Sequence, residues 1–233
     1  MSVKQKVLSQ EALKLIACIT MLIDHVGHAI VDHLSMPHLQ GIYYVCRIIG
    51  RVAFPIYCFL LAEGMRHTRN PKKYILRLGL VALLTELPYD LFFEGGFSWT
   101  CQNELVTLTL GAVMILCMQK TEKKNIKLLL ILPFAVLAEL VRSGGGGWGI
   151  VMIAVFALFD SISVQFLTLL FINAAMTSVP IIVFGIRLSI QLFAVLAMIP
   201  IASYSGKKLT HSKGVQWAFY LFYPVHLLIL WLV

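Results

Sequence analysis

The chain alternates long apolar segments with short polar ones along its whole length. Setting the apolar runs against the charged, Gly and Pro positions that interrupt them predicts nine helices. Their approximate ranges are 12–34, 42–65, 72–93, 105–119, 126–142, 148–159, 162–177, 187–204 and 215–233. A helix needs about 20 apolar residues to cross a bilayer, so nine such helices fill the chain. The pattern predicts an all-α, polytopic transmembrane bundle of about nine spans, least regular between 143 and 187.

Composition supports this class. Of the 233 residues, 59% are hydrophobic and 13% charged, with a mean hydropathy of +0.86. A soluble domain is about 25% charged, so a sizeable soluble domain and a disordered tail are both excluded. Five cysteines are an odd number, and all but Cys101 lie in apolar runs, which argues against a disulfide framework. Without internal repeats, residues 1–233 are expected to form one domain.

The basic residues predict the orientation. Thirteen of the nineteen Lys and Arg residues fall in segments on one side of the predicted spans, and only Arg142 and Arg187 fall on the other. Positive loops face the cytoplasm, so the N-terminus is expected inside and the C-terminus outside a multi-pass plasma-membrane protein. The net charge of +8 then reflects contact with anionic membrane lipid, and no nucleic-acid partner is expected.

Ionisable residues gather in the first three predicted helices. A charge at bilayer depth costs about 2.5–3.5 kcal/mol, so each needs a partner or a function. Three pairs lie one helical turn apart and could interact: Asp24 with His28, Arg47 with Arg51, and Glu86 with Asp90. The two arginines are expected to face the two carboxylates across a pair of helices, so that their charges neutralise one another. For these four residues, a structural role as ion pairs is as good an explanation as a functional one.

His25 is the strongest candidate for chemistry. It lies near the predicted membrane centre, and its imidazole can accept or release a proton near neutral pH. Adjacent helical residues point about 100° apart, so an acid orienting His25 is expected from another helix, with Glu86 or Asp90 as candidates. Together with His28 and Asp32, His25 could also line a metal site, but that spacing is weak evidence and no metal is predicted.

The inner end of the second predicted helix carries a basic cluster. Arg66, His67 and Arg69 lie within four residues and either form an ordinary cytoplasmic loop or bind a phosphate group through guanidinium donors. A phosphate site at the cytoplasmic face and a histidine at depth suit coenzyme A, which has a phosphorylated head and a thin tail. A base at depth would then activate an amine or hydroxyl for attack on the thioester. His226, beside Pro224, either lines a cavity or bonds a carbonyl freed by the proline.

Several segments resemble the TraX family. They read LKLIA and MLIDHVG in the first predicted helix, RIIGRVAFP, LAEG and HTRN in and after the second, and YILRL and ELPYD in the third. Matching segments near the C-terminus read QLFA and FYLFYPVHL. The resemblance covers both ends of the chain and is thin between about 105 and 187.

The resemblance implies an activity. TraX proteins are membrane enzymes named for acetylating the N-terminal amine of conjugative pilin with acetyl-CoA, and they look distantly similar to a wider class of membrane acyltransferases. That class has, in its first helix, an arginine and a catalytic histidine with ten residues between them, and Lys14 and His25 have the same spacing. The resemblance makes His25 the catalytic residue and places the coenzyme near Arg51, Arg66, Arg69 and Arg77. We expect His25 to act as general base or acetyl carrier, with Asp24, Glu86 and Asp90 assisting. We further expect Lys14 and His67 beside the coenzyme, and Arg47, His28 and His226 near the acceptor.

Two functions remain open at this point. The favoured one is an acetyl-CoA-dependent acetyltransferase acting on an amine or hydroxyl of a peptide, protein or glycan at the outer face. The alternative is a proton-coupled transporter that uses Asp24, His25 and Glu86 as a relay. Transporters often contain inverted repeats and paired broken helices, and the sequence contains neither pattern.

Overall fold

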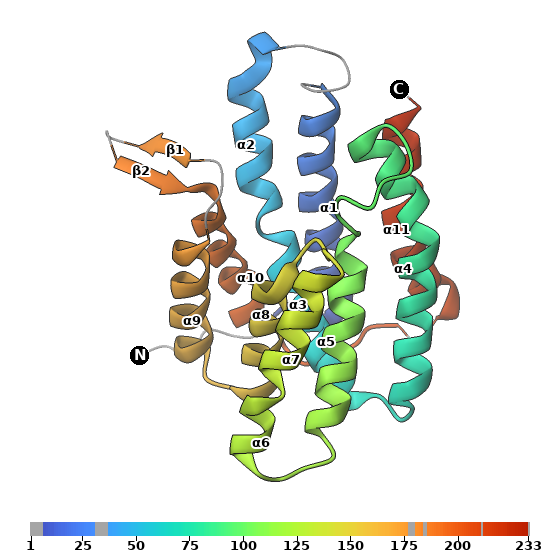
Figure 1. Cartoon of the computed structure of the whole chain (residues 1–233), viewed down its shortest axis with the longest axis vertical. Coiled ribbons are helices and arrows are strands. Elements are labelled where there is room, and N and C mark those ends of the chain that lie inside the picture. The colour runs from blue at the N-terminus through green and yellow to red at the C-terminus, as the bar shows by residue number, and fades with distance from the viewer. Residues whose placement is uncertain (1–6, 31–36, 177–179, 184–185, 211, 233) are drawn as a thin grey trace. The chain divides into compact units, whose positions relative to one another are not determined.

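The computed structural model describes residues 7–30, 37–176, 180–183, 186–210 and 212–232 (Figure 1). Helices dominate this part of the chain, in agreement with the predicted all-α class, and one two-stranded hairpin interrupts them. The chain divides into two compact units, each assembled from separate segments. Unit 1 contains Met1–Tyr57 and Ser161–Phe222, and unit 2 contains Cys58–Asp160 and Tyr223–Val233.

Unit 1 is centred on a pair of antiparallel helices, α1 and α2 (Figure 1). Ser9 begins α1, because its hydroxyl accepts a hydrogen bond from the Ala12 amide at 3.1 Å. The 3₁₀ helix η3 packs against both α2 and α9. The elements of unit 1 are α1 (Gln10–His28), η2 (Pro37–Leu39), α2 (Gln40–Gly50), the start of α3 (Ala53–His67), α9 (Ile162–Ala175), β1 (Pro180–Val183), β2 (Ile186–Ser189), η3 (Ile190–Ala197), α10 (Met198–Ala202) and the start of α11 (Lys213–Trp231).

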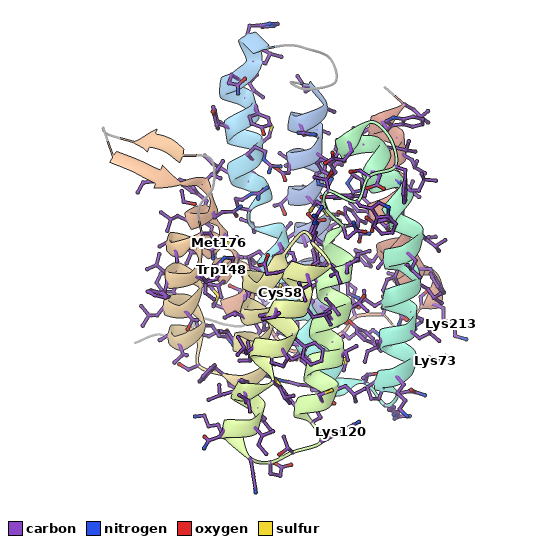
Figure 2. The ribbon with its side chains drawn as sticks, viewed as in Figure 1. Cys58, Lys73, Lys120, Trp148, Met176 and Lys213 are labelled. Carbon is purple, nitrogen blue, oxygen red and sulfur yellow. The ribbon has the colours of Figure 1, made fainter. Side chains whose placement is uncertain are left out.

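Unit 2 is built around α5, which packs against α4, α7 and α8. Asn side chains cap the first turns of α4 and α5: Asn70 accepts from the Lys73 amide and Asn103 from the Leu105 amide, both at 3.0 Å. Figure 2 places Lys73 and Lys120 at the same end of unit 2, where α4 begins and α5 ends. The unit contains most of α3, α4 (Pro71–Glu94), α5 (Glu104–Met118), α6 (Lys124–Leu129), α7 (Ile131–Leu140), α8 (Gly146–Leu158) and the end of α11.

Three predicted helices differ from the observed ones. The segment 42–65 is two helices, because α2 ends at Gly50 and a turn at 51–52 precedes α3. The segment 126–142 is divided between α6 and α7. The segment 187–204 begins in β2, which pairs with β1 in antiparallel register, and continues through η3 into α10. The end of the first predicted helix, 31–34, lies outside the described residues.

Two stretches of the described chain are long and apolar enough to cross a membrane. They are Gln40–His67, which joins α2 and α3, and Lys213–Trp231, which is α11. Four shorter apolar helical stretches of 10–17 residues accompany them. Length and apolar composition therefore support a membrane protein, and two stretches of this length in the described residues do not confirm the predicted nine spans.

Candidate functional site

A buried ion cluster joins α1 to α2 in unit 1. One carboxylate oxygen of Asp24 (Oδ2) accepts from Nη1 of Arg47 at 2.8 Å and from Nη2 of Arg51 at 2.9 Å. The Asp24 side chain is 8% exposed. Its second oxygen, Oδ1, is buried and has no hydrogen-bond partner among the described residues. The cluster thus places two guanidinium groups around one carboxylate.

Two glycines allow this close contact. A Cβ added at Gly50 would lie 2.3 Å from Cγ of Asp24, and one added at Gly27 would lie 2.4 Å from Cβ of Cys46. Both distances are too short for real atoms, so only glycine fits while α1 and α2 hold this separation. The end of α2 also helps, because Arg51 follows its last residue and its Nε donates to the Arg47 carbonyl at 3.1 Å.

This geometry corrects the predicted pairing of the charges. The arginines were expected to be neutralised by Glu86 and Asp90, yet both bond to Asp24 instead. Helix geometry allows Asp24 to reach His28 one turn along α1, and in the structure its carboxylate accepts from the two arginines. The like-charge repulsion between Arg47 and Arg51 is relieved by a carboxylate lying between them.

The histidines of α1 lie beside this cluster in sequence. His25 is 6% exposed, and His28 is partly exposed in the last turn of the helix. No group of three or more His, Cys, Asp or Glu residues in the described part of the chain is arranged to hold a metal ion. Asp32, the third residue of the metal arrangement considered from sequence, lies outside the described residues.

Lys14 lies 11 residues before His25 on α1 and is partly exposed. Its Nζ sits 5.3 Å from the centre of the Phe219 ring, which is within cation–π range. Phe219 also lines an apolar cavity of about 200 Å³ together with residues of α1 such as Cys18 and Leu22. Lys14 therefore lies near an apolar recess of unit 1.

In unit 2, the basic cluster predicted to bind phosphate is partly occupied by the protein itself. Nη2 of Arg66 donates to the Phe156 carbonyl at 2.7 Å and to the Ala157 carbonyl at 3.2 Å, and Nη1 lies 3.0 Å from Oδ1 of Asp160. These contacts satisfy carbonyl groups at the C-terminal end of α8, a structural role that the sequence did not indicate.

The other basic residues of this region are more available. His67, 74% exposed, places Nε2 3.2 Å from Oε1 of Glu63. Arg69 is exposed in the turn before α4. Arg77, on α4, has a buried Nε without a hydrogen-bond partner among the described residues. Arg69 and Arg77 thus fit a phosphate ligand better than Arg66 does.

A second buried polar region surrounds the junction of α4 and α5. Asn103 donates through Nδ2 to the Ala82 carbonyl at 2.9 Å and to Oε2 of Glu86. Asp90 is fully buried, and its Oδ2 accepts from the Ser98 amide at 3.1 Å. Oε1 of Glu86 and Oδ1 of Asp90 are buried and have no partner among the described residues.

Several members of this region were not predicted. Tyr223 donates its hydroxyl to Oε2 of Glu104, and the Tyr89 hydroxyl lies 3.6 Å from the sulfur of Cys101. Burial raises the pKa of the Cys101 thiol, so this loop cysteine is held as the neutral thiol. The one available signal was the Asn–Glu pair at 103–104, which is typical of a helix start and was not recognised as part of a site.

His226, predicted to lie near the acceptor, belongs to unit 2. It is 5% exposed, and its ring centre lies 5.8 Å from that of Tyr223, at 32° between the ring planes. The predicted site residues therefore fall into two groups. Unit 1 contains Lys14, Asp24, His25, His28, Arg47 and Arg51, and unit 2 contains Arg66, His67, Arg69, Arg77, Glu86, Asp90 and His226.

Comparisons with known proteins agree with the sequence motifs. A probable fimbrial assembly protein, FimC of serogroup H1, from Dichelobacter nodosus is 28% identical over 233 residues, covering 94% of this chain and 92% of its own length. An uncharacterized protein, RP591, from Rickettsia prowazekii (strain Madrid E) is 33% identical over 107 residues, which are 46% of this chain and 36% of that protein. No solved structure matches the chain. The family described as "TraX protein" matches residues 9–233, and the chain therefore belongs to the TraX family.

Proposed function

We propose that this protein is a membrane-embedded acetyltransferase that transfers the acetyl group of cytoplasmic acetyl-CoA to an acceptor at the outer face. The observation that carries the proposal is His25, which is buried on α1 and directly follows Asp24 of the Asp24–Arg47–Arg51 cluster in the chain. A buried titratable group beside a buried charge cluster is a common feature of catalytic sites. Family membership points the same way.

His25 acts as the general base in this proposal. Its neutral imidazole removes a proton from the acceptor amine as the nitrogen attacks the thioester carbonyl. The new C–N bond forms, the C–S bond breaks, and the coenzyme A thiolate leaves and takes up a proton. The alternative role of His25, as a transient acetyl carrier, would place labelled acetyl on the protein in the absence of acceptor.

Arg47 and Arg51 supply positive charge for the oxyanion that forms at the thioester carbonyl. Asp24 is a positioning residue, because its one oxygen binds both guanidinium groups and fixes their directions. Arg47 is 25% exposed and Arg51 17% exposed, so the cluster is partly accessible from outside the helix pair. His28 and His226 belong to the acceptor side of the proposal.

The phosphates of acetyl-CoA are assigned to basic residues that precede or follow the predicted cytoplasmic ends of spans. Arg69 and Arg77 are the principal candidates, since Arg69 is exposed and Nε of Arg77 lacks a partner among the described residues. Lys14 and His67 remain in the proposed set, whereas Arg51, inside a predicted span and bonded to Asp24, is proposed to contact the acetyl end of the coenzyme. Arg66 is the weakest member, because binding phosphate would require it to release the carbonyls of α8.

The proposed location is the plasma membrane, crossed about nine times. The helix α4 supports more than two crossings: its 24 residues are about 36 Å long. Charged residues lower its apolar composition, but Asp90 and Thr85 are fully buried inside unit 2. Five leucines of α4 form an apolar stripe suited to lipid, in which each side chain is more than half exposed. The stripe contains Leu76, Leu80, Leu83, Leu84 and Leu87.

The two units are proposed to form one functional domain, because the chain passes between them at three places. Membrane lipid surrounds this domain, and the acceptor is a peptide, protein or glycan. The acceptor proposal agrees with the name of the Dichelobacter nodosus relative, a probable fimbrial assembly protein.

The test uses purified protein in nanodiscs with acetyl-CoA labelled in the acetyl group and a peptide carrying a free N-terminal amine. We expect labelled peptide from the wild type and at least a hundredfold slower transfer by His25→Ala, since general bases contribute about 10²–10⁴-fold. His38→Ala is the matched control, because His38 is exposed in the short helix η2 and has no proposed role.

Two results would contradict the proposal. Transfer by a folded His25→Ala protein at the wild-type rate would remove His25 from the mechanism. Proton-driven solute uptake into proteoliposomes without acetyl-CoA, combined with no labelled product, would favour the transporter. Circular dichroism of each variant confirms that the fold is retained.

A further inference from the structure

The apolar cavity of unit 1 is a groove between α1 and the start of α11. Its volume is about 200 Å³, and the side chains that line it are apolar apart from the thiol of Cys18, which already bonds the Tyr57 hydroxyl at 3.2 Å. Leu15 and Ile19 of the lining are 53% and 48% exposed, so the groove is open on one side. A polar ligand would find few hydrogen-bond partners here, so the groove suits a hydrocarbon.

The groove has the length and position of part of a lipid acyl chain. Along α1 it extends from Leu15 to Leu22, and seven residues of helix rise about 10 Å. One leaflet contributes about half of the 30 Å hydrocarbon core. Since α1 begins at the predicted cytoplasmic side, the groove lies within the inner leaflet. Its volume is below the about 300–1,000 Å³ of ordinary small-molecule pockets, which favours a thin chain.

Two lysines lie at the cytoplasmic end of the groove. Nζ of Lys14 is 5.3 Å from the centre of the Phe219 ring, which is part of the groove lining. Lys208 is exposed and close enough to interact electrostatically with Lys14. The Gln10 amide donates to the Lys207 carbonyl at 2.9 Å, and this hydrogen bond holds the segment before α11 against the start of α1. The two ammonium groups are therefore brought together by the fold.

The repulsion between these ammonium groups is only partly relieved by the protein. None of the ion pairs in the described part of the chain includes Lys14 or Lys208. Glu11, one turn before Lys14, attracts it, but the Glu11 carboxylate accepts hydrogen bonds from the amides of Leu209 and Thr210. An external anion would complete this end of the groove, and lysine is a common ligand of phosphate groups.

We propose that the groove between α1 and α11 binds an acyl chain of an anionic phospholipid of the inner leaflet, whose phosphate contacts Lys14 and Lys208. Basic sites between helices at the cytoplasmic side are the usual setting for anionic lipid headgroups. The inference goes beyond the proposed acetyl transfer and assigns Lys14 to lipid rather than to the coenzyme. The thin arm of coenzyme A contains amide groups, which an apolar groove leaves without hydrogen bonds.

Native mass spectrometry of the protein in detergent, titrated with lipid, tests the inference. The probes are phosphatidylglycerol, phosphatidylcholine with the same acyl chains, and glycerophosphoglycerol, which is the anionic headgroup without chains. We expect one phosphatidylglycerol to bind about tenfold more tightly than phosphatidylcholine, because only its headgroup carries a net negative charge. Glycerophosphoglycerol should bind much more weakly than the lipid, because it leaves the groove empty.

A double lysine variant tests the headgroup contact. Lys14→Gln combined with Lys208→Gln should weaken phosphatidylglycerol binding about tenfold and leave phosphatidylcholine binding unchanged. The matched control is Lys120→Gln combined with Lys123→Gln, which removes the same charge from two exposed lysines between α5 and α6. It should bind phosphatidylglycerol like the wild type, because general attraction between the protein and anionic lipid falls equally in both variants.

A groove-filling variant tests the chain contact. Ala218→Phe places a ring in the groove and should weaken the binding of both lipids. Leu221→Phe is its control, because Leu221 lies on the same helix, is 45% exposed and does not line the groove. The melting temperature of each variant without added lipid shows whether it is folded.

Three results would overturn the lipid site. They are equal affinity for the two lipids, wild-type affinity for phosphatidylglycerol in either the double lysine or the groove-filling variant, and equally tight binding of glycerophosphoglycerol. Release of bound lipid by coenzyme A, at a concentration that supports transfer, would also overturn it and return Lys14 to the coenzyme. His25→Ala should retain the lipid, so a loss of transfer in that variant leaves this inference intact.

Discussion

At the scale of single residues, Gly50 determines whether the Asp24 cluster can form. Gly50→Ala places a Cβ 2.3 Å from Cγ and 2.4 Å from Cβ of Asp24, so the carboxylate must move from both arginines. Overpacking a tight contact costs about 1–3 kcal/mol, and disturbing the buried pair adds to this. We expect the free energy of unfolding of Gly50→Ala in detergent to be at least 2 kcal/mol lower than that of the wild type. We also expect the variant to lose acetyl transfer.

Gly41→Ala, on the same helix, is the control for Gly50. A Cβ at Gly41 meets nothing within 4 Å, and alanine favours helix over glycine by about 1 kcal/mol, so this variant should be as stable as the wild type or more so. Both free energies come from the same denaturant titration. Equal stability of the Gly50 and Gly41 variants would mean that α1 and α2 do not approach as closely as described.

The sequence indicated which residues are buried charges but not how they pair. The position of Asp24 inside an apolar run was sufficient to mark it as buried, whereas Arg47, also in such a run, remains 25% exposed. Their pairing depends on how α1 and α2 are rotated against each other, which hydrophobic pattern alone does not specify. The informative signal was Gly50, because a glycine between two arginine positions makes room for a side chain from the neighbouring helix. Tyr223 and Glu104 were missed because they are distant in sequence.

At the scale of elements, a pH-dependent clamp holds the start of α1. Glu11 accepts from the backbone N–H groups of Leu209 at 2.9 Å and Thr210 at 3.3 Å. Burial acts to raise the pKa of Glu11, but these hydrogen bonds outweigh it and keep the pKa below its usual value of 4.5. Because the folded pKa is lowered, the stabilisation is complete above pH 4.5 and disappears as the pH falls through the folded pKa.

Hydrogen exchange at the Leu209 and Thr210 amides measures this clamp. Glu11→Gln keeps an acceptor but loses the charge, and charge-assisted hydrogen bonds are about twice as strong as neutral ones. At pH 7 we expect these two amides to exchange several-fold faster in the variant, after correction for the intrinsic exchange rate at that pH. The difference between variant and wild type should shrink below pH 4.5. Glu122→Gln, exposed in the segment between α5 and α6, should leave these amides unchanged. A difference that stays constant as the pH is lowered until the wild-type protein unfolds would exclude the charge as its cause.

The end of α8 provides a test of whether Arg66 is structural. Arg66→Ala removes the donors to the Phe156 and Ala157 carbonyls. Hydrogen bonds from charged groups contribute about 1.5–3 kcal/mol, and because the Arg66 side chain is 35% exposed we expect a loss of about 1–2 kcal/mol in unfolding free energy.

The matched variant for Arg66 is Arg69→Ala, which should keep its stability and raise KM for acetyl-CoA. Measuring both quantities for both proteins separates the two roles. An Arg66→Ala protein of wild-type stability whose KM rises as much as that of Arg69→Ala would return Arg66 to the phosphate site.

Sequence patterns predicted where the helices lie better than they predicted the turns and strands that interrupt them. The apolar runs predicted helical segments wherever α1 to α11 occur, because burial in lipid or protein selects the same residues. The turn at 51–52 was missed because neither Arg51 nor Val52 is a helix breaker. The strand β2, with the sequence IRLS, was missed because four alternating residues are too few to distinguish a strand from the start of a helix, and its pairing with β1 decides the outcome.

At the scale of the whole molecule, the number of crossings can be tested by parity. If only Gln40–His67 and Lys213–Trp231 cross the membrane, the two termini lie on the same side, whereas nine crossings place them on opposite sides. The distribution of Lys and Arg predicts the N-terminus in the cytoplasm and the C-terminus outside. We therefore expect alkaline phosphatase to be active when fused to the C-terminus and inactive when fused to the N-terminus.

Cysteine labelling extends the test to a single helix, α5, which is not one of the two long apolar stretches. Gly96 precedes α5 and Glu122 follows it, and a side chain at Gly96 meets nothing within 4 Å. In a background in which the native cysteines are replaced by serine or alanine, a membrane-impermeant maleimide added to intact cells should label Gly96→Cys and not Glu122→Cys. Permeabilising the cells should expose both sites. Labelling of both positions before permeabilisation would mean that α5 does not cross the membrane. Failure to label Gly96→Cys in intact cells would overturn the outer location of the loop between α4 and α5.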